Sequence, residues 1–409
     1  IQVRDVMFTT ANHYNEDKTV MEGWADKNGT IRKDGEVSDR MGWGVPDLDK
    51  GMYGPGQFLG KFDYDMSNTK LDVWSNNISN VALDQRRAED EQWLKDYDKN
   101  LNADDYVLGE DWNVLNGTLD TGDHVVSKED AKKWRAEYFA KRKAAIEAKL
   151  ANGEYEGSLV KRGAGTLVMT GNNSYRGGTT VEGGKLLGFA ESFGVTGDDA
   201  KASANGKVVV NGGTFGLLEK YNDQFTMKGE LVAGKHDPQN EVAVPEHSVD
   251  VTVNKGGTFQ ITAGQSVTMG NLEFKDGAGF TVGSEDVDVL KEAYAGKDQT
   301  GTVTVDKMTG ADLAVANPDY AFFKTELKAE GNKLTGTLSR DKNASFATYA
   351  QNANGHAIAG ALEAAGNGAL YDTLIGASKG DVTKTYNSLG DDFVLNTRNA
   401  GIANGMLLA

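Results

Sequence analysis

"SLVKRGAGTLVMTGNNSYRGGTTVEGGKLLG" spans residues 158–188, and this stretch decides the fold. Its side chains alternate with the period of two that is typical of a β-strand. Leu167 and Met169 point to one side, and Thr166 and Val168 point to the other. Pairs of glycines interrupt this alternation. Glycine tolerates a positive φ angle, so each pair predicts a tight bend between two short strands.

The same kind of bend recurs downstream. The segments EGGKL (182–186), NGGTF (211–215) and KGGTF (255–259) share the pattern x-G-G-x-apolar, and DGAGF (276–280) is a relative. Repetition at intervals of about 20 to 45 residues is typical of a solenoid, in which each copy forms one turn. Hairpins of a β-sandwich also use Gly-Gly turns, but the internal repetition favours the solenoid. We expect the strands between the bends to have one buried face.

Composition limits the classes of function. The chain has 409 residues, 51 glycines, no cysteine and a formal charge of −17. The acidic balance argues against nucleic acid or an anionic membrane as the main partner. The absence of cysteine excludes disulfides and thiol catalysis. No apolar run is long enough for a transmembrane helix, and Ile1 does not open a signal peptide. We expect the chain to be part of a longer polypeptide.

Helical periodicity replaces the strand pattern in other parts of the chain. Residues 1–11 predict a short helix. Residues 82–100 and 127–150 are rich in Ala, Glu, Lys and Arg, and they predict two amphipathic helices joined by a polar loop. One face of the second helix carries Trp134, Tyr138, Ala145 and Leu150.

The Ala-rich segment 354–378 also has a helical pattern. Leu362, Leu370 and Leu374 are its candidate buried positions.

The opening stretch resembles the autotransporter-associated β-strand repeat. The repeat pattern is L-x-K-x-G-x-G-T-L, then G-x-N-x-Y-x-G-x-T-x-V, then G-x-L. The residues that carry the resemblance are Leu159, Lys161, Gly163, Gly165, Thr166, Leu167, Gly171, Asn173, Tyr175, Gly177, Thr179, Val181, Gly183 and Leu186. The resemblance implies a right-handed parallel β-helix, as in the passengers of Gram-negative autotransporters.

Two flanking regions resemble other parts of such passengers. VRDVMFTTA (3–11) and GWGVPDLDKGMYGPGQF (42–58) are similar to the end of a subtilisin-like catalytic domain, and DVWSNNIS (72–79) and the charged insert after it extend that similarity. LYDTL (370–374) and the segment 389–408 resemble the region before a translocator barrel. The resemblance implies two partners within the same polypeptide: an upstream subtilisin-like domain and a downstream outer-membrane barrel.

The catalytic motifs of that protease family do not occur here. A subtilisin-like enzyme needs an Asp, a His on a helix and a Ser in a G-T-S-x-A-x-P context. No G-T-S occurs, and none of the histidines lies in an H-G-T-H-V-type helix; they are His13, His124, His236, His247 and His356. We therefore predict no catalytic, cofactor-binding or metal-binding residues in this chain, and no cofactor. The parent polypeptide is expected to be a serine protease.

Two weaker patterns suggest metal sites. DKNGTI (26–31) resembles half of a calcium loop, but an Asx-type turn is the favoured interpretation. His236 and His247, near Asp237 and Glu246, could form a metal pair, but two surface histidines are favoured.

The sequence thus predicts a mainly β protein: a right-handed parallel β-helix with an N-terminal α/β remnant and a helical insert. The expected parts are the subtilisin-like remnant (1–60), a linker and charged insert (61–152), the β-helical stalk (153–340) and the junction before the barrel (341–409). The favoured function is a stalk that displays a protease at the cell surface or outer membrane. The alternatives are an adhesive module that binds host-surface proteins and a β-helix lyase.

Overall fold

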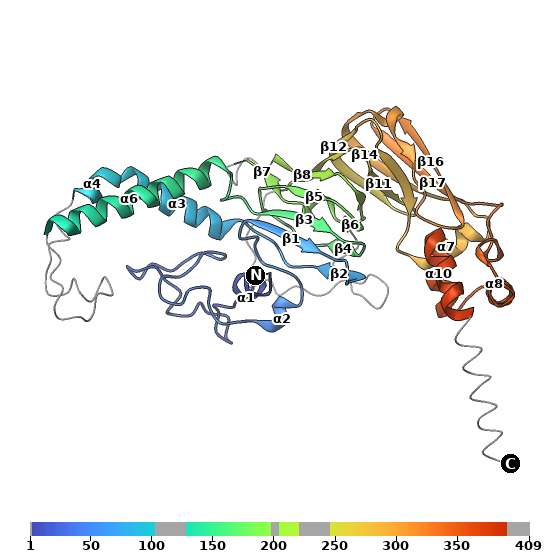
Figure 1. The fold of residues 1–409 in the computed structure, drawn as a ribbon, viewed down its shortest axis with the longest axis horizontal. Coiled ribbons are helices and arrows are strands. Elements are labelled where there is room, and N and C mark those ends of the chain that lie inside the picture. Colours follow the sequence, from blue (N-terminus) through green and yellow to red (C-terminus); the bar gives the residue numbers. More distant parts are fainter. Residues whose placement is uncertain (1, 103–127, 198–203, 221–245, 391–409) are drawn as a thin grey trace, which may run out of the picture.

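The protein is elongated, and its parts follow one another along the long axis (Figure 1). The structure, a computed structural model, describes residues 2–102, 128–197, 204–220 and 246–390. A helical arm lies at one end, a stack of strands lies in the middle, and a group of helices lies at the other end. Within these described ranges, no helix combines the length and apolar character that a membrane span requires.

Two sheets run along the stack. The first sheet has ten strands: β1 (Lys61–Asp65), β3 (Ser158–Arg162), β5 (Thr179–Val181), β8 (Ala204–Val210), β10 (Val249–Val253), β12 (Ser266–Phe274), β14 (Gln299–Thr309), β17 (Lys333–Arg340) and β16 (Phe323–Glu330), with β7 (Val195–Thr196) paired to β8. The second has seven: β2 (Leu71–Trp74), β4 (Thr166–Met169), β6 (Lys185–Gly188), β9 (Gly213–Leu217), β11 (Gly257–Thr262), β13 (Gly279–Gly283) and β15 (Val315–Ala316).

Apart from β7, the strands from β1 to β15 alternate between the two sheets along the chain. Each pairs in parallel with the strand of the same sheet in the next turn, as β3 does with β5 and β4 with β6. We call one such turn a rung. Hairpins would give antiparallel neighbours, so the alternative of a β-sandwich of hairpins is wrong. The mainly β class is confirmed, and the parallel alternation is compatible with a β-helix.

The core lies between the two sheets as columns of side chains from successive rungs. Register places Leu167, Leu186, Phe215, Phe259 and Phe280 in one column of the second sheet. All five side chains are buried. Parallel in-register stacking repeats the same inward position at every rung, so one apolar residue per strand builds a continuous core.

The predicted Gly-Gly bends are confirmed by backbone angles. Gly184 has φ 65° and Gly213 has φ 68°. Such left-handed conformations cost little only for glycine. Each bend carries the chain from the first sheet to the second within a few residues.

The expectation that each strand has a single buried face is wrong for much of the second sheet. All residues of β11 and β13 are buried. Val168, assigned to the polar side, is buried with Leu187, Phe189 and Leu218 in a second apolar cluster. Two outward threonines of β11 have partners: Thr258 Oγ1 accepts from Asn317 Nδ2 (2.9 Å), and Thr262 Oγ1 donates to the Leu217 carbonyl (3.1 Å). Other parts of the chain therefore cover this face.

The two predicted amphipathic helices form the arm. It consists of α3 (Val81–Lys95), α4 (Tyr97–Leu101) and α6 (Lys128–Ala151). The expectation that this insert precedes the first rung is wrong, because β1 and β2 lie before it and pair with β3 and β4. The arm thus leaves the stack between its first and second rungs. The domain boundaries as such stay predictions.

The packed face of α6 also differs from the predicted one. Trp134 is 51% exposed and Tyr138 is exposed too. Phe139 instead packs edge-on against Trp93 (5.1 Å between ring centroids), and Arg142 lies over the same indole. Ile146 is buried. The helix has two apolar stripes, and the aromatic partners on α3 and α4 select the other one.

Helices close the C-terminal end of the stack: α7 (Val287–Tyr294), α8 (Ala353–Ala365), α9 (Ala369–Ile375) and α10 (Lys379–Gly390). Together with the antiparallel strands β16 and β17 we call them the cap. Tyr294, Phe322, Phe346 and Tyr371 form an aromatic cluster inside it. Leu370 was predicted to be buried, and this is wrong: it is 37% exposed. Its neighbour Tyr371 on α9 turns inward in its place.

Candidate functional site

The repeat residues of 158–188 hold the bends of the stack. Lys161 occupies an inward position of β3, in register with Val181 of β5, and its side chain is buried. Its ammonium donates to three carbonyl oxygens: those of Arg162 (3.1 Å), Gly163 (2.9 Å) and Gly183 (2.9 Å). Burial lowers the pKa of Lys161 to about 8. The lysine therefore ties together the bends of two neighbouring rungs.

Asn173 and Tyr175 have similar structural roles. Asn173 is buried; its Oδ1 accepts from the Ile78 amide (2.7 Å), and its Nδ2 donates to the Ser192 carbonyl (2.7 Å). The Tyr175 hydroxyl is hydrogen-bonded to Thr179 Oγ1 (2.6 Å). These side chains satisfy buried polar groups where the backbone leaves the strands. The repeat motif is thus explained by architecture.

Replacing Lys161 with methionine should lower the free energy of unfolding by about 2–3 kcal/mol, because buried carbonyls lose their donor while the aliphatic stem keeps its packing. Urea denaturation followed by far-UV circular dichroism measures the loss. The matched control is Lys207→Met, since Lys207 is exposed on β8 of the same sheet. Equal stability of the two variants would contradict the proposed role of Lys161.

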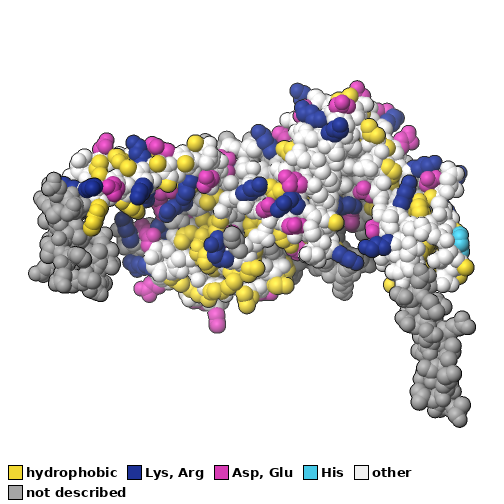
Figure 2. Space-filling model, viewed as in Figure 1, with side chains coloured by type: hydrophobic (Ala, Val, Ile, Leu, Met, Phe, Trp, Pro, Cys, Tyr) yellow, Lys and Arg dark blue, Asp and Glu magenta, His cyan; other side chains and the backbone are white. Residues whose placement is uncertain are grey.

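An apolar surface lies beside the first rung. Helices α1 (Gln2–Thr9) and α2 (Leu48–Gly51) carry it, and Figure 2 shows hydrophobic side chains gathered over this part of the molecule. Leu48 is 72% exposed and Met52 is 78% exposed. Val3, Met7, Phe8 and Val45 are exposed as well. Scattered apolar side chains are ordinary on a surface, but a contiguous group of this kind is typical of an interface.

An apolar hollow of about 460 Å³ opens between these helices and the edge strands β1 and β2. Val6, Met7, Met52 and Trp74 are among its lining residues. Asp72 lies in the same hollow and accepts hydrogen bonds from the Tyr64 hydroxyl (2.6 Å) and the Trp74 indole (3.0 Å). Burial and the Asp72 carboxylate raise the pKa of Tyr64. With its carboxylate satisfied in this way, the hollow is suited to apolar side chains.

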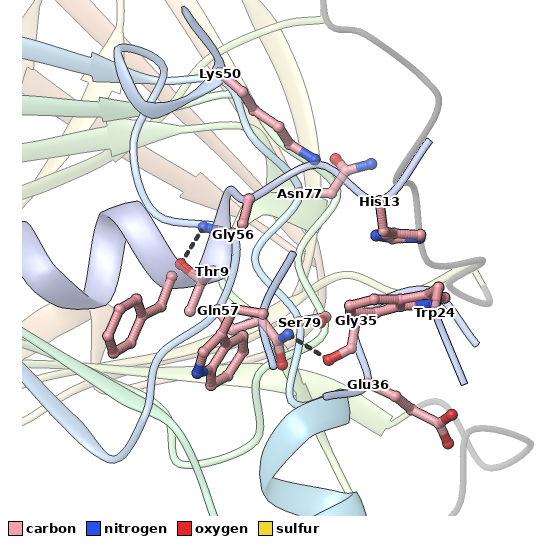
Figure 3. Close-up of a pocket in the computed structure, with 13 residues that line it drawn as sticks. Thr9, His13, Trp24, Gly35, Glu36, Lys50, Gly56, Gln57, Asn77 and Ser79 are labelled. Carbon is pink, nitrogen blue, oxygen red and sulfur yellow. Dashed lines mark hydrogen bonds between the residues drawn. The ribbon is translucent and has the colours of Figure 1, made fainter. Parts of the chain in front are cut away.

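A second, polar hollow lies on the other side of the N-terminal segment (Figure 3). His13 is buried, and its ring stacks on Trp24 (4.1 Å between centroids). Its Nε2 is 2.8 Å from Asp34 Oδ1, which also accepts from the Tyr14 hydroxyl (2.6 Å). Burial alone would raise the pKa of Asp34, but the hydrogen bonds from His13 and Tyr14 hold that pKa below its usual value.

A His–Asp pair resembles two parts of a catalytic triad, but the third part is not in place. Within the described ranges, the His13 ring is hydrogen-bonded to Asp34, and no serine hydroxyl reaches that ring. His247 contacts the Glu191 carbonyl (3.0 Å), and His356 is exposed on α8. His124 and His236 lie outside the described residues. The prediction that the chain carries no catalytic, cofactor or metal residues stays a prediction.

The structure also bears on the two metal hypotheses. Asp26 Oδ1 accepts from the amides of Asn28 (2.8 Å) and Thr30 (2.8 Å), so the favoured Asx-type turn is confirmed. In the second hypothesis, His236 and Asp237 lie outside the described residues. Among the residues that the structure describes, no group of three or more His, Cys, Asp or Glu side chains is arranged to hold a metal ion.

Sequence reasoning missed an ion cluster that joins the repeat to the segments directly before α7 and β16. Lys185 of β6 lies 3.2 Å from Glu285 and 4.0 Å from Asp319. Burial alone would lower the pKa of Lys185, but the two carboxylates outweigh it and raise that pKa. Glu285 is 100 residues away from Lys185 in sequence and Asp319 is farther still, so no local pattern indicates the contact.

Comparison with known proteins agrees with this architecture. Residues 159–187 match the passenger-associated-transport-repeat family. Two curated relatives, both described as "Extracellular serine protease" from Serratia marcescens, are 28% identical over 223 and 218 residues. Each match covers 51% of this chain and 19% of the relative, so the chain spans about a fifth of their length. The resemblance to the passenger region of a serine protease autotransporter is confirmed.

Proposed function

We propose that this chain is the β-helical stalk of a Gram-negative autotransporter, with the right-handed coil that the resemblance implies. It carries a subtilisin-like serine endopeptidase domain at its N-terminal end and is followed by an outer-membrane barrel of the same polypeptide. Its task is to hold the protease away from the cell surface and to support its folding there.

The roles of the repeat residues carry this proposal. The conspicuous side chains of the matched repeat, Lys161, Asn173 and Tyr175, are buried and bonded within the stack. Such side chains cannot meet a substrate, but they do fix a long, stiff coil of parallel strands. A mechanical role follows more directly from this arrangement than catalysis does.

The apolar surface over α1 and α2 supports the position of the protease. An acidic chain with a formal charge of −17 repels a second copy of itself. An apolar face of this kind therefore favours a neighbouring domain as its cover. The curated relatives are named as extracellular serine proteases, and such a domain is the neighbour that we propose.

Replacing Leu48 with aspartate tests the proposal. The side chain is 72% exposed in this chain. The change should therefore alter the free energy of unfolding of the isolated chain, measured by thermal denaturation, by no more than about 0.5 kcal/mol. In the whole polypeptide, displayed on cells, it should lower the amount of protease that reacts with a fluorophosphonate probe, because a charge is then buried in the domain interface.

Leu313→Asp is the matched control, since Leu313 is an exposed leucine at the opposite end of the stack. If Leu48→Asp and Leu313→Asp reduce probe labelling equally, the apolar surface does not contact the protease. Labelling of the isolated chain itself would overturn the view that it is not the enzyme. Binding of the isolated chain to host-matrix or glycan arrays would favour the adhesive alternative.

A further inference from the structure

The N-terminal end of the stack leaves both sheets open. In the strand order, β1 is the last strand of the first sheet at this end, and β2 is the last strand of the second. β1 pairs with β3 on one side, and no strand within the described ranges pairs with its other side. A strand at the edge of a sheet presents a row of unpaired backbone N–H and C=O groups. Such a row is a template for a further strand.

The backbone hydrogen bonds of β1 show which of its residues face the open side. The Ser158 amide donates to the Gly60 carbonyl (3.1 Å). The Met66 amide donates to the Arg162 carbonyl (2.9 Å). Because successive residues of a strand turn their backbone groups to opposite sides, the even-numbered residues in between also face β3. The odd-numbered residues face away from it: Lys61, Asp63 and Asp65. The Asp63 carbonyl agrees with this, since it accepts from the side-chain amide of Gln2 on α1.

The inward columns of the stack stop at the same end. Phe62 of β1 is in register with Leu159 of β3, and Trp74 of β2 is in register with Met169 of β4. Phe62, Tyr64 and Trp74 also line the apolar hollow of about 460 Å³. Since parallel strands in register repeat the same inward position, the inward side chains of one more rung would lie next to these three residues. The hollow therefore offers apolar space beside the open edge of β1.

We propose that an extended segment of the neighbouring protease domain adds to β1 as one more parallel strand and places alternate apolar side chains in the hollow. The inference rests on the proposed function and specifies how the two domains join. Strand addition uses both features of this end, because the edge supplies backbone hydrogen bonds and the hollow accepts every second side chain. A backbone N–H of the segment replaces the Gln2 amide at the Asp63 carbonyl. An apolar small molecule would fill the hollow but leave the backbone row unpaired.

The test is amide hydrogen exchange at single-residue resolution, measured on this chain and on the whole polypeptide. We expect the amides of Lys61, Asp63 and Asp65 to exchange at least about tenfold more slowly in the whole polypeptide, because the added strand then accepts their hydrogen bonds. The amides of Phe62 and Tyr64 are the internal control. They face β3 and should be protected equally in both samples.

A proline variant tests the backbone contact directly. Asp65→Pro removes an N–H that faces away from β3, and an edge strand tolerates proline at such a position. Asp65→Ala is the matched control, since it removes the same carboxylate and keeps the N–H. In the whole polypeptide, only Asp65→Pro should lose the protection of the Lys61 and Asp63 amides. Protected Phe62 and Tyr64 amides in the proline variant show that β1 itself is intact.

Oxidation of Met52 by hydrogen peroxide separates this inference from the proposed function. Met52 is 78% exposed, so slower oxidation in the whole polypeptide reports that the surface over α1 and α2 is covered. Slow oxidation together with unchanged exchange at Lys61, Asp63 and Asp65 would overturn strand addition and leave the domain contact standing. Unchanged oxidation and unchanged exchange would overturn both. Edge protection in this chain alone that rises with protein concentration would assign the edge to a second copy and overturn the inference.

Discussion

Replacing Gly184 with alanine should lower the free energy of unfolding by about 3–5 kcal/mol, among the largest effects of any single methyl group in this chain. Gly184 has φ 65°, a conformation that costs an L-residue roughly 1–2 kcal/mol. An added Cβ would also overlap the carbonyl oxygens of Gly163 and Gly165 and the Lys161 ammonium. The two carbonyl oxygens belong to the backbone of the bend in the preceding rung and cannot move away without disturbing the stack.

The neighbouring glycine provides the control. A Cβ at Gly183 would have its nearest neighbours, the backbone N and O of Gly163, at 3.6 Å, which is ordinary contact. Gly183→Ala should therefore change the free energy of unfolding by no more than about 0.5 kcal/mol. Chemical denaturation followed by circular dichroism compares the two variants. If both variants lose similar amounts of unfolding free energy, the left-handed conformation and the close backbone approach at Gly184 do not set the tolerance of this bend.

The same glycines mark the limit of what the sequence could predict about the bends. The paired pattern predicts where the chain turns, and the structure confirms each turn. It does not predict which member of a pair needs the left-handed conformation: the second glycine does in 183–184 and 212–213, but the first does in 256–257. That choice depends on how the following strand enters its sheet, which is decided by register with the neighbouring rung.

Burial on the outer faces could not be read from alternation either. A period of two identifies two faces, but it does not say whether a second layer covers the polar one. Val168 is buried against Leu187, Phe189 and Leu218 of the neighbouring rungs, and every residue of β11 is buried as well. The Trp24–His13 contact escaped prediction for a related reason, since both residues lie in a segment without regular periodicity.

Leu334→Ala in the cap should slow the refolding of the rungs at residues 205–285, although it lies many residues away. Leu334 is buried on β17, and its strand pairs antiparallel with β14, which itself pairs with β12 of the preceding rung. Loss of such a side chain costs about 2–5 kcal/mol, a large part of the 5–15 kcal/mol typical of a domain. If folding starts at the cap and propagates through the stack, the loss appears in the folding rate.

Two further variants make the comparison sharp. Leu374→Ala is a second cap variant, because Leu374 is buried whereas Leu370 is not. The control must remove an equally buried side chain from the arm. Trp134 is too exposed for this purpose, and Ile146, which is 3% exposed, is suitable. Ile146→Ala should weaken the arm and leave the refolding of the rungs unaltered, since the arm leaves the stack far from β14.

Pulse-labelled hydrogen exchange during refolding distinguishes the outcomes, because it reports protection of amides in β8 to β13 separately from the arm. Slower protection in both cap variants, with unchanged protection in Ile146→Ala, fits a stack that grows from the cap. In that case β14, which pairs with both β17 of the cap and β12 of the stack, is where growth begins. Equal slowing in all three would mean that the rungs fold without a preferred end. The stalk would then still be a stiff support, but its proposed part in folding the protease at the cell surface would lose its physical basis.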